Sequence, residues 1–205
     1  MKRIAVFASG GGTDFQSVID ANAKEHFCEI VCLIASKAGI GAIERAQRCG
    51  IPHAVYAKKD YPDIEELYRE LAYRLNMQGV DYIVLAGWLK IIPQSFIEAF
   101  KDRIINIHPS LIPAFCGRGM YGLRVHEAVL GYGAKVTGAT VHFVTGEPDG
   151  GPIVLQKAVD VLPCDTPESL QKRVMEQCEH LLLPRAVALF CQNRLSVDGR
   201  KVTIL

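Results

Sequence analysis

The sequence predicts an α/β fold: an open, mostly parallel twisted sheet with helices on both faces and antiparallel additions in the C-terminal third. Short β-rich runs alternate with helical patterns through the first half, which is typical of parallel strands joined by right-handed crossovers. The run VDYIVLAG at 80–87 is almost continuously apolar, as expected of a central strand covered on both faces. Without a linker or a repeat in 205 residues, we expect one domain over 1–205.

Strands and helices alternate from the N-terminus. The run KRIAVFA at 2–8 predicts a strand that ends in a glycine loop, and 14–25 predicts the helix after it. EIVCLIAS at 29–36 predicts the second strand, and 40–49 predicts a helix closed by a glycine. The weaker run PHAVYA at 52–57 predicts a third strand.

The strongest helix signal lies at 62–78, where Pro62 suits the first helical turn. Apolar residues recur there at helical spacing and predict a buried face. They are Ile64, Leu67, Tyr68, Leu71 and Leu75. The central strand at 80–87 follows, then a short helix opened by a proline and a strand at 103–108.

The C-terminal third predicts two long strands, at 134–145 and 151–162, joined by a turn rich in Gly, Pro and Asp. Thr166 and Pro167 predict the start of a long helix, because Thr is a good cap and Pro fits the first turn. The buried stripe of this helix is predicted at Leu170, Val174, Cys178 and Leu181. The tail at 194–205 carries Asp-Gly between two β-like runs, which is a hairpin signal.

Composition argues against several classes of protein. Lys plus Arg number 23 and Asp plus Glu number 22, so affinity based on a basic nucleic-acid footprint is not expected. No apolar run approaches a membrane span, and the apolar stretch at the start is too short for a signal peptide. The seven cysteines are odd in number and lack C-x-x-C spacing, which argues against a disulfide framework or a zinc site. We therefore expect a cytoplasmic protein that binds neither nucleic acid nor membrane.

A glycine-rich loop, ASGGGTDF at 8–15, follows the first strand and opens a helix. Backbone N–H groups at such a helix N-terminus bind anions. No Gly-Lys-Ser/Thr follows, and Phe15 stands where a dinucleotide fingerprint needs Gly or Ala. The loop therefore favours a small phosphate group, and the alternative is a turn required only for chain reversal.

Two stretches fall just beyond predicted strands, at the edge where open α/β sheets bind ligands. LAGWLKII at 85–92 contains a glycine that would let a ligand approach the backbone closely, followed by residues that could line an apolar slot with free backbone polar groups. The alternative is that these apolar side chains belong to the core. Asn106 and His108 share one face of the next strand and supply an amide donor and an imidazole that titrates near neutral pH. The alternative for His108 is a structural histidine with satisfied hydrogen bonds.

Asp149 lies in the glycine-rich turn within 142–153. Either it bonds its own backbone, as Asp does in many turns, or it lies close to His108, where it would raise the imidazole pKa and fix the tautomer. His142 is interpreted as a structural or orienting residue. Glu179 either belongs to the polar face of the last helix or faces the site.

Four segments together resemble the folate-dependent formyltransferases: SGGGTD at 9–14, LAGWLKII at 85–92, NIHPSLIP at 106–113 and VHFVTGEPDGGPIVLQ at 141–156. The resemblance extends from residue 2 to about residue 190. It implies a Rossmann-like fold and an enzyme that moves a formyl group from 10-formyltetrahydrofolate to an amine. The glycine loop and the short length indicate glycinamide ribonucleotide, a purine precursor, as the acceptor. No metal is implied, and a monomer or a homodimer is expected.

The resemblance also implies site residues. In the catalytic set of Asn106, His108 and Asp149, the amide and a protonated imidazole would donate to the oxyanion, and the carboxylate would keep the imidazole charged. The phosphate and ribose would contact Gly11, Gly12, Thr13, Asp14 and Glu179. The folate would contact Trp88, Leu89, Lys90, Ile91, Ile92, Asn106, His142, Val144 and Thr145.

Three features depart from the family pattern. Asp14 stands where Asn is usual, and a carboxylate beside a phosphate is unfavourable unless it caps the helix and faces away. Ile64 stands where some members have an Arg near the folate tail. The stretch 114–129 is longer than in the commonest members, and its Gly-rich centre suggests a mobile lid. Arg118 within it either serves the phosphate or is an exposed loop residue.

Other functions stay open at this point. A methionyl-tRNA formyltransferase would need a further basic C-terminal domain, and a formyltetrahydrofolate hydrolase would need an N-terminal regulatory domain; we expect neither in this chain. A non-catalytic nucleotide-binding α/β module is the alternative from a different class.

Overall fold

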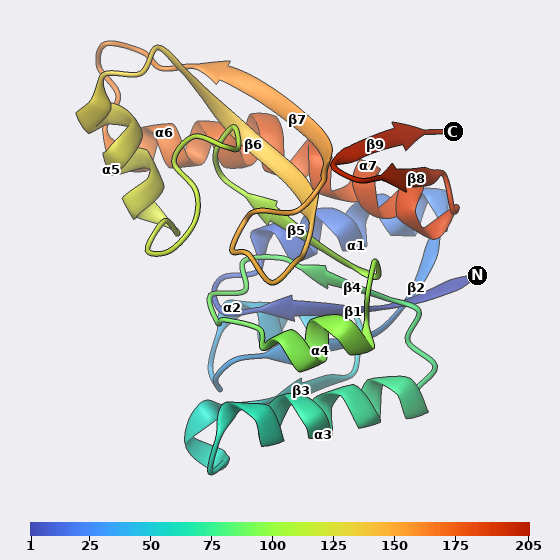
Figure 1. Cartoon of the computed structure of the whole chain (residues 1–205). Coiled ribbons are helices and arrows are strands. Elements are labelled where there is room, and N and C mark those ends of the chain that lie inside the picture. Colours follow the sequence, from blue (N-terminus) through green and yellow to red (C-terminus); the bar gives the residue numbers. More distant parts are fainter.

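A computed structural model describes all 205 residues and contains one seven-stranded sheet and a separate two-stranded hairpin (Figure 1). The sheet order is β3-β2-β1-β4-β5-β6-β7. The first five strands of this order pair in parallel, and β6 pairs antiparallel with both β5 and β7. The strands are β1 Lys2–Ala8, β2 Cys28–Ala35, β3 His53–Val55, β4 Tyr82–Leu85, β5 Ile104–His108, β6 Val136–Phe143 and β7 Ile153–Asp160. This arrangement confirms the predicted fold class.

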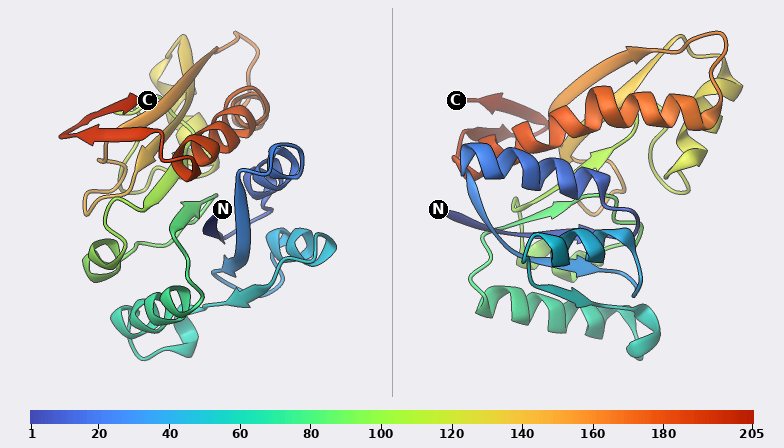
Figure 2. Two further views of the ribbon diagram at one scale, coloured as in Figure 1. Left: turned by 90° about the vertical axis from the view of Figure 1, so that its right-hand side faces the viewer. Right: turned by 180° about the vertical axis from the view of Figure 1, so that it is seen from behind.

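Helices cover both faces of the sheet, with α3 and α4 on one face and α1, α2, α6 and α7 on the other (Figure 2). Their bounds are α1 Thr13–Glu25, α2 Gly41–Arg48, α3 Ile64–Met77, α4 Gln94–Ala99, α5 Leu123–Tyr132, α6 Pro167–Val174 and α7 His180–Cys191. A short 3₁₀ turn lies at Lys58–Asp60, and a π-helical turn, Met175–Glu179, joins α6 to α7. The predicted tail hairpin forms as β8 Leu195–Asp198 and β9 Lys201–Ile204. No helix has the length and apolar content needed to cross a membrane.

The central strands have apolar side chains on both faces because both faces are covered. In β1, Ile4 and Val6 pack into the larger core on the α1 side, whereas Ala5 and Phe7 pack into the smaller core beneath α3 and α4. All four are fully buried. Such two-sided burial fixes the strand tightly at the centre of the sheet, so the loop that follows it has a well-defined start.

The helix start signals are confirmed at α6 and corrected at α3. Thr166 caps α6 by accepting from the Ser169 N–H, and Pro167 occupies the first turn as predicted. At α3 the cap is Asp63, whose side chain accepts from the Glu66 N–H at 2.7 Å. Pro62 therefore precedes the helix instead of lying in its first turn.

Two further corrections concern the second half. Residues 123–129, predicted as part of a long loop, belong to α5, so the loop after β5 is shorter than expected. Leu181 is exposed, while Leu182 and Leu183 are buried. The π-helical turn inserts an extra residue into the helix and rotates the following side chains, which moves the buried stripe away from Leu181.

We predict that Gly138→Ala destabilises the protein by about 1–3 kcal/mol or more, because overpacking a tight contact is costly. A Cβ at Gly138 in β6 would collide with the Lys157 carbonyl oxygen and lie 2.9 Å from Leu111 Cδ2. Gly131→Ala in α5 is the matched control, since a Cβ there meets nothing within 4 Å. Urea unfolding should show this control to be neutral or slightly stabilised; equal stability of the two variants would contradict the tight β6–β7 contact.

Candidate active site

A cavity of about 640 Å³ lies beyond the carboxyl ends of β4 and β5 and reaches the N-terminus of α1. Loops at 87–92, 117–122 and 144–149 form much of its wall. Every residue that the sequence indicated for the site lines this cavity except Gly11 and Gly12. The prediction that ligands bind at this edge of the sheet is therefore consistent with the presence of a cavity there.

His108, the last residue of β5, is buried, and partners face both of its ring nitrogens. Its Nε2 lies 3.0 Å from the Phe115 carbonyl oxygen, which can only accept, so Nε2 carries a proton. Its Nδ1 lies 3.5 Å from Asp149 Oδ2. The imidazole is thus held between the loop after β5 and the loop between β6 and β7.

Asp149 reaches this position through an unusual backbone conformation. Its φ of 55° lies in the left-handed region, which Asp and Asn tolerate better than other residues with a Cβ. Its Oδ2 also accepts from the Gly117 N–H at 2.8 Å. Of the two interpretations of Asp149, the structure supports proximity to His108, and the carboxylate also ties the 117–122 loop to the site.

Asn106 and His142 form a second polar pair. They lie directly opposite each other in the antiparallel ladder of β5 and β6, so their side chains share one face. His142 Nδ1 lies 2.9 Å from the Phe143 carbonyl oxygen, which assigns the proton to Nδ1. In the neutral ring Nε2 then accepts from the Asn106 amide at 3.1 Å. The same nitrogen lies 3.5 Å from Asp149 Oδ1, to which it can donate only when the ring is charged. The predicted orienting role of His142 fits this geometry.

The protonation of His108 differs from the expectation. Burial lowers the pKa of His108, and although Asp149 and the Phe115 carbonyl raise it, the net pKa lies below the ordinary value. For Asp149, burial raises the pKa, but His142, His108 and the Gly117 N–H together hold it below the ordinary value. The carboxylate thus favours a charged imidazole, as predicted, but burial outweighs this effect in the unliganded site.

The glycine loop positions α1 and exposes its first turn. Gly12, the N-cap, has a φ of 73°, and a Cβ there would lie 2.7 Å from Ala42 Cα, so only glycine lets α1 approach α2. Gly11 also has a structural role, because its carbonyl oxygen accepts a hydrogen bond from Arg45 Nε at 2.8 Å. Gly10 and Thr13 are the loop residues that line the cavity. The first N–H groups of α1 have no partner within the helix, as anion binding requires.

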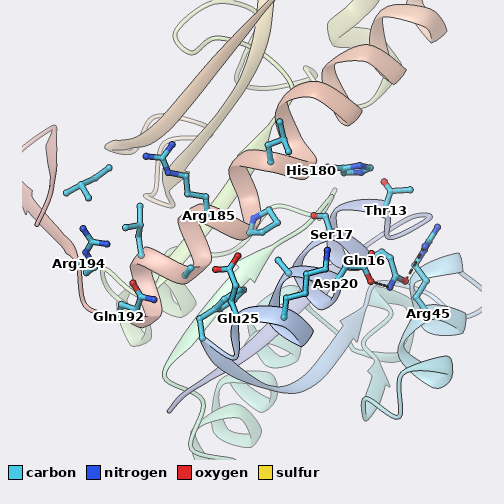
Figure 3. A pocket seen from close by; sticks show the side chains of 18 residues that line it. Thr13, Gln16, Ser17, Asp20, Glu25, Arg45, His180, Arg185, Gln192 and Arg194 are labelled. Carbon is cyan, nitrogen blue, oxygen red and sulfur yellow. Dashed lines mark hydrogen bonds between the residues drawn. The ribbon is translucent and has the colours of Figure 1, made fainter.

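Acidic residues lie beside this helix N-terminus. Asp14 does not cap the helix, contrary to the condition stated from the sequence, and its Oδ1 is buried without a hydrogen-bond partner. The nearest base is His180, whose Nε2 lies 3.8 Å away. Glu179, which precedes His180, also lines the cavity, so it faces the site. Figure 3 shows His180 beside Thr13 in a second pocket, which is lined largely by residues of α1 and α7.

The 87–92 loop serves the core as well as the cavity. The Trp88 indole donates to the Tyr68 hydroxyl at 3.0 Å and is almost fully buried. The Leu89 N–H donates to Ser9 Oγ, so it is not free for a ligand, whereas the side chains of Leu89 and Ile91 are exposed. Ile64 does not line the cavity but packs against the core at the start of α3.

Sequence reasoning missed several lining residues. His126 on α5 is fully buried, and neither ring nitrogen has a partner. A polar residue between the buried Val125 and Val129 of α5 was the available signal, but that helix was not predicted. Tyr121 was also missed; it lines the cavity together with Arg118, whose contact with a phosphate the sequence left open, from the loop that was interpreted as a lid. Whether this loop moves stays a prediction.

Comparisons with known proteins agree with the geometry. Residues 2–187 match the formyl transferase family model. The chain is 43% identical over 196 residues to the chloroplastic phosphoribosylglycinamide formyltransferase of Arabidopsis thaliana, covering 95% of this chain and 67% of that protein. It is 38% identical to the phosphoribosylglycinamide formyltransferase of Haemophilus influenzae, covering 95% of this chain and 90% of that protein. Glycinamide ribonucleotide transformylase 1 of Symbiobacterium toebii superposes with a TM-score of 0.93 at 40% identity, covering 100% of this chain and 94% of that one.

We predict that Asp149→Asn lowers the pKa of His108 further, because the carboxylate raises that pKa and the amide does not. Asn tolerates the same backbone conformation, so the loop should keep its shape. The measurement is an NMR titration of the histidine Cε1–H resonances, with Glu147→Gln in the same loop as the control. An unchanged or raised His108 pKa in Asp149→Asn would show that the two side chains do not interact.

Proposed function

The chain belongs to the formyl transferase family, and on this premise we propose that it transfers a formyl group from 10-formyltetrahydrofolate to the amine of glycinamide ribonucleotide in purine biosynthesis. The products are N-formylglycinamide ribonucleotide and tetrahydrofolate. The observation that supports the proposal is that Asn106, His108 and Asp149 line one cavity, with His108 Nδ1 3.5 Å from Asp149 Oδ2, and that the same cavity reaches the start of α1, where backbone N–H groups are available to an anion.

The chemistry needs groups that act on three atoms. The neutral substrate amine attacks the formyl carbon, the carbonyl oxygen becomes an oxyanion, and the folate N10 leaves with a proton. Asn106 is oriented by His142 through one amide proton, and its second amide proton donates to the oxyanion. Protonated His108 is the second donor, and stabilisation of this developing charge is usually the largest catalytic contribution in acyl transfer.

His108 must change partners to act. Its Nε2 donates to the Phe115 carbonyl in the unliganded site, so donation to the formyl oxygen requires this bond to open. Asp149 stays beside Nδ1 and stabilises the imidazolium as charge develops. The proton lost by the attacking amine balances the proton gained by the leaving folate nitrogen, and a histidine can carry that proton between the two nitrogens.

The ligands would divide the cavity between them. The exposed apolar side chains of Leu89 and Ile91 suit the flat folate ring, and Val144 and Thr145 line the same cavity. Thr13 and the first N–H groups of α1 suit the phosphate of the ribonucleotide. Arg118, which also lines the cavity, is a further cation available to the phosphate.

We predict that His108→Ala lowers kcat for formyl transfer by about 10²–10³-fold, with little change in the affinity for either substrate, since it removes a donor used mainly in the transition state. Steady-state kinetics with 10-formyltetrahydrofolate and glycinamide ribonucleotide tests this. His53→Ala, at an exposed position on the edge strand β3, should retain wild-type activity. Wild-type turnover in His108→Ala would refute the assigned role.

Transfer is distinguished from hydrolysis by the acceptor. The same enzyme is offered 10-formyltetrahydrofolate with glycinamide ribonucleotide, and separately with water alone. We expect tetrahydrofolate release only when the ribonucleotide is present. Rapid release with water alone would identify a hydrolase, and no reaction in either case would favour a non-catalytic binding protein.

A further inference from the structure

Two carboxyl groups line the cavity at the start of α1, where a phosphate is expected to bind, and Thr13 Oγ1 contacts Met175 Sδ at 3.3 Å and joins the two elements that carry them. Asp14 in the first turn of α1 and Glu179 at the end of the π-helical turn both line the cavity beside Thr13. The side chain of Asp14 is only 15% exposed, and its Oδ1 has no hydrogen-bond donor. An ionised carboxylate in such a place is costly, because water is excluded and no donor compensates.

The charges around the pair do not compensate for two negative groups. His180 Nε2 lies 3.8 Å from Asp14, but burial lowers the pKa of His180, and Arg45 lowers it too, against the opposing effect of Glu176. Figure 3 shows His180 and Arg45 on either side of Thr13. Arg45 itself is bound to the Gly11 carbonyl and to Gln16. His180 and Arg45 do not line this cavity; its lining contains Lys90 and Arg118, and neither forms an ion pair with the two acids.

On the function proposed above, we propose that Asp14 and Glu179 share a proton and that binding of the phosphorylated acceptor draws a proton onto this pair. A phosphate dianion at the start of α1 adds negative charge beside the two carboxyl groups and further disfavours their ionisation. Burial already raises the pKa of Asp14 to about 6 and, with the Asp14 charge, raises that of Glu179 well above its ordinary value.

The sign of the pH dependence follows. The pair is protonated at lower pH and ionises as the pH rises through its raised pKa values, so repulsion of the phosphate grows with pH. If one proton is taken up, affinity for the ribonucleotide falls by about tenfold per pH unit above that range. Neutralising Asp14 removes the repulsion, so Asp14→Asn should bind the ribonucleotide more tightly at alkaline pH and with a flatter profile.

Titration calorimetry counts the protons directly. Glycinamide ribonucleotide is titrated into the protein at pH 7.5 in buffers of different ionisation enthalpy, and the slope gives the number of protons bound. We expect wild type to take up about half a proton or more, and Asp14→Asn to take up less than half of that number. Asp20→Asn, an exposed carboxylate on the same helix, should match wild type. Glycinamide ribonucleoside, which lacks the phosphate, should cause little uptake.

The outcomes separate this inference from the proposed function. Equal proton uptake by wild type, Asp14→Asn and Glu179→Gln, in protein that transfers formyl groups, would overturn the proton coupling and leave the function intact. Absence of both binding and formyl transfer in wild type would overturn the function and the coupling with it. If Asp14→Asn does not fold, a reduced uptake in Glu179→Gln supports the coupling and an unchanged uptake refutes it.

Discussion

A buried imidazole with partners at both ring nitrogens organises this protein's site. A buried polar group without a partner costs about 1–3 kcal/mol, so the Nε2–H of His108 favours an arrangement in which an acceptor faces it, and the carboxylate beside Nδ1 favours the charged form of the ring. The Phe115 carbonyl comes from the loop after β5, and the Asp149 carboxylate from the loop between β6 and β7. Asp149 also accepts from Gly117, which joins the two loops to each other. The contacts of His108 and Asp149 therefore join two of the loops that line the cavity.

The sheet topology makes this arrangement possible. Parallel β4 and β5 end at the same edge, which leaves the 87–92 loop and His108 side by side there. Antiparallel β6 then places His142 opposite Asn106. If the pairing slipped by one residue, the two side chains would lie on opposite faces of the sheet. The mixed sheet thus combines a ligand-binding edge with a direct cross-strand contact that orients the amide.

Burial shifts the pKa values of the groups at the two ends of the cavity in opposite directions. It lowers the pKa of His108 and raises that of Asp14, and both shifts favour the neutral form of the group. The site therefore carries less charge than its ionisable residues would carry in water. An anionic ligand would act differently at the two ends, because a developing oxyanion favours the charged imidazole of His108 whereas a phosphate favours the neutral carboxyl group of Asp14. This links substrate binding to protonation at both ends.

The sequence by itself determined the fold class and the start of α6, because apolar periodicity and capping at Thr166 are local properties of the chain. It did not determine that Asp149 approaches His108, since 41 residues separate them and only the β6–β7 hairpin closes that distance. The burial of His126 and the exposure of Leu181 were likewise decided by packing and by the π-helical turn. Proximity and desolvation are properties of the folded whole, so pKa shifts and contacts emerge only in the tertiary structure.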